Sequence, residues 1–344
     1  MLTLAEVSLP IARKLMLIVV TLCLLAAPLY AAANKTGFTS FIVGNPADAQ
    51  QSPNLSPGLV LMGGGTDVDA AFQWMCQRAG GGDFVVIRTT GTDAYNPYIQ
   101  QLCPQMDSVE TIIITSTTGA NSAYVSSQIQ NAEALWIAGG DQSTYVNLWR
   151  GTAVQTGVNF LLNSKHAPVG GTSAGLAVLS QFIYTGELGS VTSSQALANP
   201  FHRYVTLDRD LFQSTLGQNK IYDSHFVTRD RMGRSLVFLA RIVDNGWAAQ
   251  PRGIGIDEET ALLVLPNGAA SMVGVGAAYF LQAPGPAQVL AAKTPMTYLN
   301  IGVYKLPQGG TFDFSTWSGT GGVAYTLNVN NGAVTSTQAG GNIY

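Results

Sequence analysis

One serine in the sequence stands in a setting that favours nucleophilic chemistry. Ser173 lies in Gly-Thr-Ser-Ala-Gly at 171–175, which matches the pattern G-x-S-x-G. In this pattern a strand turns sharply into a helix and exposes the serine hydroxyl, and the flanking glycines let strand and helix approach closely. The peptide N–H of the next residue, Ala174, can then face the oxyanion that develops in acyl transfer. The pattern predicts a nucleophile, although the pentapeptide alone is weak support because its residues are common.

A nucleophilic serine needs a general base, which at neutral pH is usually a histidine. The sequence holds three, and His225 follows a strand-like apolar pair, so we predict that it lies at the same sheet edge as Ser173 and is the base. His166 precedes the serine in the segment that leads into the turn, and His202 lies in a loop; we expect both to be structural or surface imidazoles. The acid that orients the base is expected beside a later strand, and spacing alone does not choose among Asp257, Glu258 and Glu259.

A cluster of arginines directly follows the predicted base. The cluster comprises Arg229, Arg231 and Arg234, in a chain of which only 11% is Asp, Glu, Lys or Arg. A solvated helix face is the ordinary interpretation of such a run, but the segment offers few acidic partners, namely Asp223 and Asp230. Guanidinium groups bind carboxylates through paired hydrogen bonds. We therefore predict a substrate that carries carboxylates near the bond to be cleaved.

The composition excludes some partners. The 344 residues are 47% hydrophobic, which is enough for a substantial core, and the charged fraction is well below the roughly 25% of ordinary soluble domains. The net charge is −3 and the body of the chain has no basic tract, so nucleic acid is not expected as a partner, because phosphate binding needs clustered positive charge. No Cys and His residues have the spacing of zinc ligands, and we expect no metal and no cofactor.

Residues 1–33 resemble a cleavable export signal. Arg13 and Lys14 precede an apolar run at 15–27, which the small-residue stretch Tyr-Ala-Ala-Ala-Asn follows shortly afterwards. The apolar run is shorter than the roughly 20 residues that span a membrane, so we expect no stable membrane anchor and predict a secreted or periplasmic protein. In an oxidising compartment Cys76 and Cys103 could form one disulfide, but two buried thiols fit the sequence equally well.

The body of the chain alternates between strand-like and helix-like segments. A polar stretch at 34–57 is expected to be flexible. Short apolar runs closed by Gly, Thr or Ser predict buried strands at 58–65, 83–91, 110–116 and 134–140, with segments of helical length between them. This alternation predicts an α/β fold with a mostly parallel sheet, whose ligand site lies at the carboxyl ends of the strands. Beyond these, 253–274 predicts two strands, a turn and a third strand, and the Gly-, Thr- and Ser-rich texture of 286–344 predicts a β-rich C-terminal extension.

Five motifs in this order resemble the cyanophycinase branch of the serine peptidase family that also contains aspartyl dipeptidase. They are MGGG at 62–65, GGDQS at 139–143, GTSAG at 171–175, DSHFVTRDRMGR at 223–234 and GIGIDEETAL at 253–262. The resemblance implies a peptidase domain over 58–285 with a flavodoxin-like three-layer sandwich, related to the class I glutamine amidotransferases. It also implies a serine exopeptidase that hydrolyses cyanophycin, a poly-aspartate with arginine on its side chains, to β-Asp-Arg dipeptides.

The resemblance implies roles for individual residues. The implied triad is Ser173 as nucleophile, His225 as base and Glu258 as the orienting acid. The implied oxyanion donors are Gly139, Gly140 and Ala174. The implied substrate-binding residues are Gln142, Asp223, Ser224, Arg229, Arg231 and Arg234. Ser224 departs from the family, whose cyanophycin-cleaving members usually have glutamine there, and this departure leaves peptidases for other aspartyl or isoaspartyl peptides as an alternative.

Two further alternatives lie outside this class. A non-catalytic binding protein of the same fold would have no need of a serine, a histidine and a glutamate together. An esterase of the α/β-hydrolase type shares the serine turn, but its histidine normally follows the acid, whereas His225 precedes Glu258. The sequence is compatible with a homodimer and does not determine the oligomeric state.

Overall fold

The computed structural model of the protein describes residues 36–49 and 54–344. Residues Thr36–Tyr344 form one compact unit. In the described part of the chain the strands form two sheets, one of ten strands and one of eight. The predicted export signal at 1–33 lies outside the described residues. None of the helices within the described ranges is long and apolar enough to cross a bilayer.

Five parallel strands form the centre of the first sheet, in the spatial order β4-β3-β5-β6-β2. They are β2 (Gly58–Met62), β3 (Asp83–Arg88), β4 (Ser108–Ile114), β5 (Ala134–Ile137) and β6 (Pro168–Thr172). Their side chains are almost all buried, because helices cover both faces of the sheet. The strands predicted from the apolar runs are therefore confirmed.

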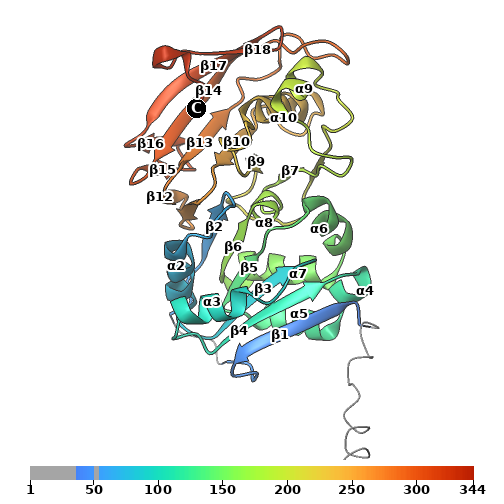
Figure 1. Cartoon of the computed structure of the whole chain (residues 1–344), viewed down its shortest axis with the longest axis vertical. Coiled ribbons are helices and arrows are strands. Elements are labelled where there is room, and N and C mark those ends of the chain that lie inside the picture. Colours follow the sequence, from blue (N-terminus) through green and yellow to red (C-terminus); the bar gives the residue numbers. More distant parts are fainter. Residues whose placement is uncertain (1–35, 50–53) are drawn as a thin grey trace, which may run out of the picture. The chain divides into compact units, whose positions relative to one another are not determined.

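Helices cover the two faces of this sheet (Figure 1). On one face lie α2 (Asp69–Ala79) and α3 (Tyr95–Leu102), and on the other lie α5 (Ala123–Asn131) and α7 (Ala153–Phe160). Short helices α4 (Thr117–Ala120) and α6 (Gln142–Trp149) belong to the second group. The parallel centre of the sheet with helices on both faces is the predicted flavodoxin-like three-layer sandwich, and antiparallel strands extend the sheet on both sides.

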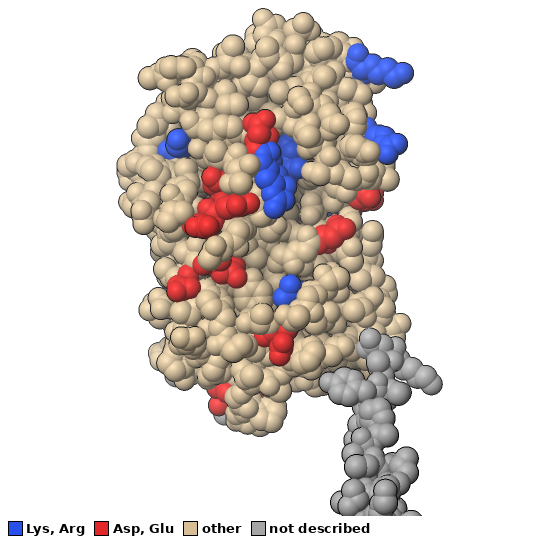
Figure 2. Space-filling model, viewed as in Figure 1, with Lys and Arg blue, Asp and Glu red and all other residues tan. Residues whose placement is uncertain are grey.

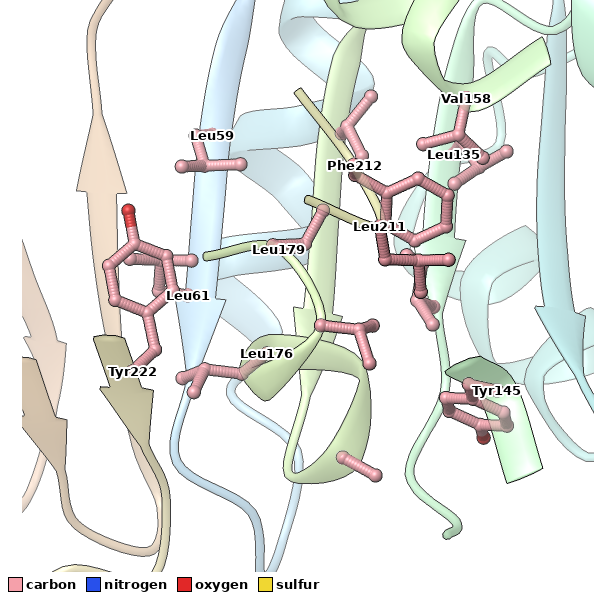
Figure 3. Close-up of a cluster of buried hydrophobic side chains, with 14 of the residues drawn as sticks. Leu59, Leu61, Leu135, Tyr145, Val158, Leu176, Leu179, Leu211, Phe212 and Tyr222 are labelled. Carbon is pink, nitrogen blue, oxygen red and sulfur yellow. The ribbon is translucent and has the colours of Figure 1, made fainter. Parts of the chain in front are cut away.

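Alternation along each strand divides the core between the two faces. On β2, Leu59 and Leu61 face the core that contains Val158 of α7, as Figure 3 shows, whereas Val60 and Met62 pack on the side of α2. All four side chains are at most 1% exposed. Burial on both faces fixes the strand register, because a shift by one residue would exchange the two sets of side chains.

The edge strand β1 (Phe38–Gly44) corrects one prediction. The stretch 34–57 was expected to be flexible, but residues 38–44 pair antiparallel with β4 along their whole length. Because β1 is only partly buried, its residues do not show the continuous apolar run that predicted the buried strands. Its order comes from backbone hydrogen bonds to a neighbour about 70 residues away, which no local pattern reveals.

The second sheet begins with three parallel strands. These are β7 (Phe182–Tyr184), β9 (Lys220–Asp223) and β10 (Arg252–Ile256), with β8 (Leu207–Arg209) antiparallel at the edge. The helices α9 (Ser193–Ala198) and α10 (Met232–Asp244) pack on one face of this sheet. On the other face, side chains of β9 and β10 join the core that the first sheet shares with α7.

The β-rich extension predicted at 286–344 contributes β14 (Tyr298–Pro307), β17 (Val323–Asn330) and β18 (Ala333–Ser336) to the second sheet and β15 (Thr311–Asp313) and β16 (Ser318–Thr320) to the first, each beyond strands of the preceding region. The second sheet continues antiparallel through β13 (Ala277–Gln282), β14, β17 and β18. The first sheet continues through β11 (Thr260–Val264), β12 (Ala269–Gly274), β15 and β16. The strands β10, β11 and β12 confirm the prediction for 253–274. The connection from β10 to β11 passes from one sheet to the other, and this crossing lies at the candidate site.

Candidate active site

Ser173 lies on the turn between β6 and the one-turn helix α8 (Ala174–Ala177). Its backbone has φ 54° and ψ −114°, a conformation that residues with a side chain rarely adopt. The neighbouring glycines make the turn possible. A Cβ on Gly175 would lie 2.0 Å from the carbonyl oxygen of Ile137, and one on Gly171 would lie 2.5 Å from the carbonyl carbon of Gly175. The helix after the serine can therefore pack directly on the strands, as the G-x-S-x-G pattern predicted.

His225 follows β9 of the second sheet and meets the serine across the junction of the sheets. Its Nε2 lies 2.8 Å from Oγ of Ser173. Its backbone also has a positive φ, of 47°, and its N–H donates a 2.8 Å hydrogen bond to the carbonyl of Gly63. The imidazole is therefore anchored at its backbone by the loop after β2 and directed at the serine.

The connection from β10 to β11 supplies the partner of the imidazole. Oε1 of Glu258 lies 2.5 Å from Nδ1 of His225. Asp257 faces away, and its Oδ1 accepts hydrogen bonds from the backbone of Val227 and from the backbone and hydroxyl of Thr228. Glu259 accepts a 3.3 Å bond from the hydroxyl of Thr66. Of the three acids that spacing could not separate, the structure brings only Glu258 to the histidine.

The other two histidines lie elsewhere. His166 ends the short π-helix before β6 and lines a separate cavity with Leu216 and Pro266. The ring nitrogen Nδ1 of His202 accepts a hydrogen bond from the backbone of Tyr204. Both side chains therefore have the structural positions that the sequence analysis expected.

The electrostatic environment favours the neutral form of His225. Burial lowers the pKa of its imidazole from the ordinary value, and the positive charges of Arg229 and Arg231 act in the same direction, while the bond to Glu258 opposes them. The guanidinium of Arg229 lies 3.9 Å from the carboxylate of Glu258 and is more than half exposed. A neutral imidazole at neutral pH can accept a proton from the serine, which is what a general base must do.

The loop Gly63–Gly65 forms a close-fitting support for the pair of His225 and Glu258. A Cβ on Gly64, whose φ is +100°, would lie 2.3 Å from Cε1 of the imidazole, and one on Gly65 would lie 3.0 Å from Cβ of Glu258. A Cβ on Gly63 would lie 1.9 Å from the carbonyl oxygen of Asp257. The sequence analysis placed this run of three glycines at a strand end, where the ligand site is expected, but it did not predict that the glycines contact His225 and Glu258.

A cavity of about 90 Å³ adjoins the serine. Its lining includes most of the residues predicted to bind the substrate or the oxyanion, namely Gly140, Gln142, Ala174, Asp223, Ser224, Arg229 and Arg231. Tyr184, Tyr222 and Ala177 also line it and were not predicted. Figure 2, drawn from the same side as Figure 1, shows few charged side chains on this face, with a basic group and acidic groups close together near its middle.

The peptide unit between Gly139 and Gly140 lies beside the hydroxyl of Tyr145. That hydroxyl has one proton for two carbonyl acceptors, that of Ala138 at 2.9 Å and that of Gly139 at 3.1 Å. Because the peptide is trans, the N–H of Gly140 points away from the Gly139 carbonyl. Gly139 packs against the serine, since a Cβ built on it would lie 3.6 Å from Cβ of Ser173. The N–H groups of Gly140 and Ala174 thus both belong to residues that line the cavity.

Arg234 does not line the cavity, in contrast to its predicted role in binding substrate. It is 2% exposed, and its Nε and Nη2 bind the two carboxylate oxygens of Asp223 at 2.8 and 2.6 Å. It is buried because it lies in the first turn of α10, on the helix face that packs on the second sheet. Although burial alone would raise the pKa of Asp223, Arg234 and Arg231 hold that pKa below its ordinary value.

Arg231 lies between this buried pair and the cavity. Its Nη1 donates to Oδ1 of Asp223 at 3.2 Å, to the carbonyl of Ser224 at 2.8 Å and to the hydroxyl of Ser224 at 3.2 Å. Gln142 donates from its side chain to the carbonyl of Tyr184. Arg229 therefore remains the most exposed cationic group at the site. Among the described residues, no three His, Cys, Asp or Glu side chains are grouped so as to hold a metal ion.

The fold and the site together define a flavodoxin-like α/β protein with a serine, a histidine and a glutamate in hydrogen-bond contact. Its sequence is similar to the cyanophycinases. It is 24% identical over 215 residues to the cyanophycinase of Nostoc sp., covering 60% of this chain and 65% of that protein. It is 23% identical over 199 residues to the cyanophycinase of Geminocystis herdmanii, covering 57% of this chain and 67% of that protein. The resemblance predicted from the motifs is thereby confirmed.

The alignment with the Nostoc protein spans just under two thirds of its length. No protein-family model matches the sequence. Among solved structures, a crystal structure of a peptidase from an acI-B1 Actinobacterium superposes with a TM-score of 0.51 at 16% identity, covering 76% of this chain and 98% of the other. That likeness supports the assignment of the fold.

Proposed function

We propose that this chain is a serine peptidase in which Ser173 is the nucleophile, His225 the general base and Glu258 the orienting acid. The observation that carries the proposal is the continuous contact from Oγ of the serine through both ring nitrogens to the glutamate carboxylate, at 2.8 and 2.5 Å. This arrangement has the geometry that a base-activated serine requires. The similarity to cyanophycinases and the fold of a solved peptidase agree with it.

The proposed reaction proceeds through an acyl-enzyme. Oγ of Ser173 attacks the scissile carbonyl carbon while His225 takes the hydroxyl proton, and the N–H groups of Ala174 and Gly140 bind the oxyanion. The imidazolium then gives its proton to the leaving amine, and the C–N bond breaks to leave an ester on the serine. A water molecule, deprotonated by the same imidazole, hydrolyses that ester and restores the hydroxyl. Glu258 holds the tautomer with the proton on Nδ1 and stabilises the imidazolium.

The proposed substrate is cyanophycin, cleaved from a chain end to β-Asp-Arg dipeptides. Arg229 and Arg231 place positive charge in a cavity that reaches the serine, and this charge suits the carboxylates of an aspartate polymer. The name of the similar curated proteins points to the same substrate. The cavity is small, which suits the end of a chain. Ser224 keeps a second candidate open, a peptidase for isoaspartyl peptides that lack arginine.

The decisive experiment incubates the purified protein with insoluble cyanophycin and identifies the released products by mass. Release of β-Asp-Arg dipeptides is expected from the wild type and none from Ser173→Ala, with an unchanged melting temperature. Ser126→Ala, on the helix α5, is the matched control and should retain full activity. Unchanged turnover in Ser173→Ala would refute the serine mechanism. Hydrolysis of isoaspartyl dipeptides but not of cyanophycin would favour the second candidate.

We further propose that the protein is exported and that 1–33 is removed. The disulfide between Cys76 and Cys103 supports an oxidising compartment, and the low content of charged residues agrees with it. N-terminal sequencing of the secreted protein should begin near Asn34. Material that retains Met1 would contradict cleavage.

A further inference from the structure

The helix α10 begins without a cap of its own. Its N-cap position is held by Arg231, which makes no side-chain capping bond. Ser, Thr, Asp and Asn are preferred there because their oxygens accept hydrogen bonds from the free N–H groups of the first turn, whereas a guanidinium can only donate. The guanidinium of Arg231 instead donates to Asp223 and Ser224 beside the cavity. A residue that lines the cavity thus occupies a position where a helix normally needs an acceptor.

Two hydroxyl groups from distant segments supply acceptors to the first turn. Oγ of Ser193 accepts a 3.1 Å bond from the N–H of Arg234, and Tyr344 serves the first N–H of the helix. The hydroxyl oxygen of Tyr344 accepts a 2.9 Å bond from the N–H of Met232, the first residue of α10, across 112 positions of sequence. The same hydroxyl donates a 2.8 Å bond to Oδ1 of Asp230. Asp230 has a φ of 47°, in the left-handed region that disfavours side chains, so the bond holds a strained residue in place. One hydroxyl therefore joins the start of the helix to the last bend before it.

The ring of Tyr344 extends this contact toward the catalytic histidine. It packs edge-on against Phe226 and Tyr279, with centroids 6.0 and 5.8 Å apart. Phe226 directly follows His225, and its ring fills the space over Gly255, where a Cβ would lie 2.3 Å away. The segment 226–231 is here called the arginine loop. The ring of Tyr344 contacts its first residue, Phe226, and the hydroxyl of Tyr344 binds the backbone directly after its last residue.

The end of the sequence is itself fixed. The hydroxyl of Tyr325 on β17 donates 2.9 Å to the carbonyl of Ile343, and the amide of Gln338 donates 2.8 Å to the carbonyl of Asn342. Other contacts hold the arginine loop elsewhere, namely Asp257 on its first half and Ser193 of α9 on the carbonyl of Asp230. None of these accepts from Met232, so the hydroxyl of Tyr344 has no substitute among the described contacts.

We propose that Tyr344 is a positioning residue for the arginine loop, through which the β-rich extension holds Arg229 and Arg231 in place at the substrate cavity. The kinetic part of this proposal rests on the proposed function. Tyr344 touches neither Ser173 nor the cavity, and it acts by fixing the backbone from which Arg229 and Arg231 project. Loss of its hydroxyl should loosen the loop and leave the serine, histidine and glutamate in contact.

The first test is amide hydrogen exchange of the full chain carrying Tyr344→Phe, which keeps the ring and removes both hydroxyl bonds. Loss of a helix cap is worth about 1 kcal/mol, so exchange of the amides at 226–232 should rise about fivefold. Tyr304→Phe is the matched control, because that hydroxyl likewise accepts from a backbone N–H, of Gly322, outside the loop. Unchanged exchange at 226–232, or an equal rise throughout the chain, would overturn the proposal.

The second test separates positioning from chemistry. For a soluble trimer of β-Asp-Arg, Tyr344→Phe should raise KM several-fold and change kcat little. Its rate of inactivation by phenylmethylsulfonyl fluoride, a small neutral reagent for activated serines, should equal that of the wild type. An unchanged KM would refute the kinetic part. If the wild type neither cleaves the trimer nor reacts with the reagent, the proposed function fails, whereas the exchange experiment still decides the structural part.

Discussion

The α-carbon of Gly64 lies against the imidazole of His225, so closely that a Cβ there would sit 2.3 Å from Cε1 and 2.6 Å from Nε2. Cε1 lies between the two ring nitrogens, of which Nε2 is 2.8 Å from the hydroxyl of Ser173 and Nδ1 is 2.5 Å from the carboxylate of Glu258. The glycine therefore sets the position of the base as directly as Glu258 does from the other nitrogen. Any side chain at this position must displace the ring.

Gly64→Ala should accordingly reduce turnover while the protein remains folded. Because a displaced imidazole no longer accepts the serine proton, kcat should fall by about 10²-fold or more, with a smaller change in KM. Both the cost of a positive φ and the displacement reduce stability, the former by about 1–2 kcal/mol. Steady-state kinetics and thermal denaturation measure the two effects.

Gly151→Ala provides the control for this variant. Gly151 also has a positive φ, of +70°, but nothing lies within 4 Å of the position its Cβ would take. It should lose a similar amount of stability and no activity. Equal activity of the two variants would mean that Gly64 does not set the position of the base.

The sequence predicted the serine and the histidine because each lies at the end of a strand, where a local pattern suffices. Spacing alone could not choose the acid, and only the family resemblance pointed to Glu258, because Asp257, Glu258 and Glu259 are consecutive and the crossing between the two sheets decides which way each points. The structure directs the middle one to His225 and its neighbours to Thr228 and Thr66. A choice of this kind depends on contacts between segments distant in sequence.

Contacts between distant segments also decide where the arginines lie and which sheet the β-rich extension joins, so the sequence did not predict either. The three arginines were predicted to bind substrate carboxylates together, but Arg234 is buried in a pair with Asp223, whereas Arg229 is exposed at the site. Nothing near Arg231 in sequence indicates that Tyr344 caps its helix. The strand β14 of the extension pairs with β13 and β17 in the same sheet as β9, the strand that His225 follows. Composition alone predicts that the extension is rich in strands, but not which sheet those strands join.

The rate should depend on pH through His225. The base must be neutral, and burial holds the pKa of the imidazole below its ordinary value of 6.5, so the midpoint of the acid limb of kcat/KM should lie below pH 6.5. Removing the positive charge in Arg229→Gln raises this pKa and should move the acid limb to higher pH, whereas Arg229→Lys should leave it in place. Profiles of kcat/KM against pH test this, and an acid limb in the wild type above pH 7 would contradict it.

Arg231 and Arg234 should differ in what they control. Arg234→Met removes the bidentate partner of the buried Asp223 carboxylate, and breaking such a pair typically costs about 3–5 kcal/mol. Arg231→Ala leaves that pair intact and should act mainly on KM for an anionic substrate. Urea denaturation and steady-state kinetics of the two variants provide the comparison. A large loss of stability in Arg231→Ala with none in Arg234→Met would reverse these assignments.

The stability due to the pair of Arg234 and Asp223 should also depend on pH. The pKa of Asp223 is lowered in the folded state, so the unfolded chain binds a proton more readily as the pH falls. The stabilisation should therefore be fully present above about pH 4 and be lost as the pH falls through the folded-state pKa. The difference in unfolding free energy between wild type and Arg234→Met should shrink as the pH falls below about 4. A difference in unfolding free energy that does not change with pH in this range would show that folding does not lower the pKa of Asp223.

The disulfide between Cys76 and Cys103 should be a major source of stability. It joins α2 to the residue after α3 across 27 positions, and a cross-link of this span restricts the unfolded chain by about 3–4 kcal/mol at 25 °C in the loop-entropy description. Cys76→Ala/Cys103→Ala should lower the unfolding free energy by about that amount and leave kcat unchanged, because neither cysteine lies in the cavity beside Ser173. Both side chains are fully buried, so a reductant should act on the wild type only once denaturant opens the structure. Thiol titration of the purified protein in denaturant without reductant should detect no free thiol from Cys76 and Cys103, and detection of both would refute the pairing.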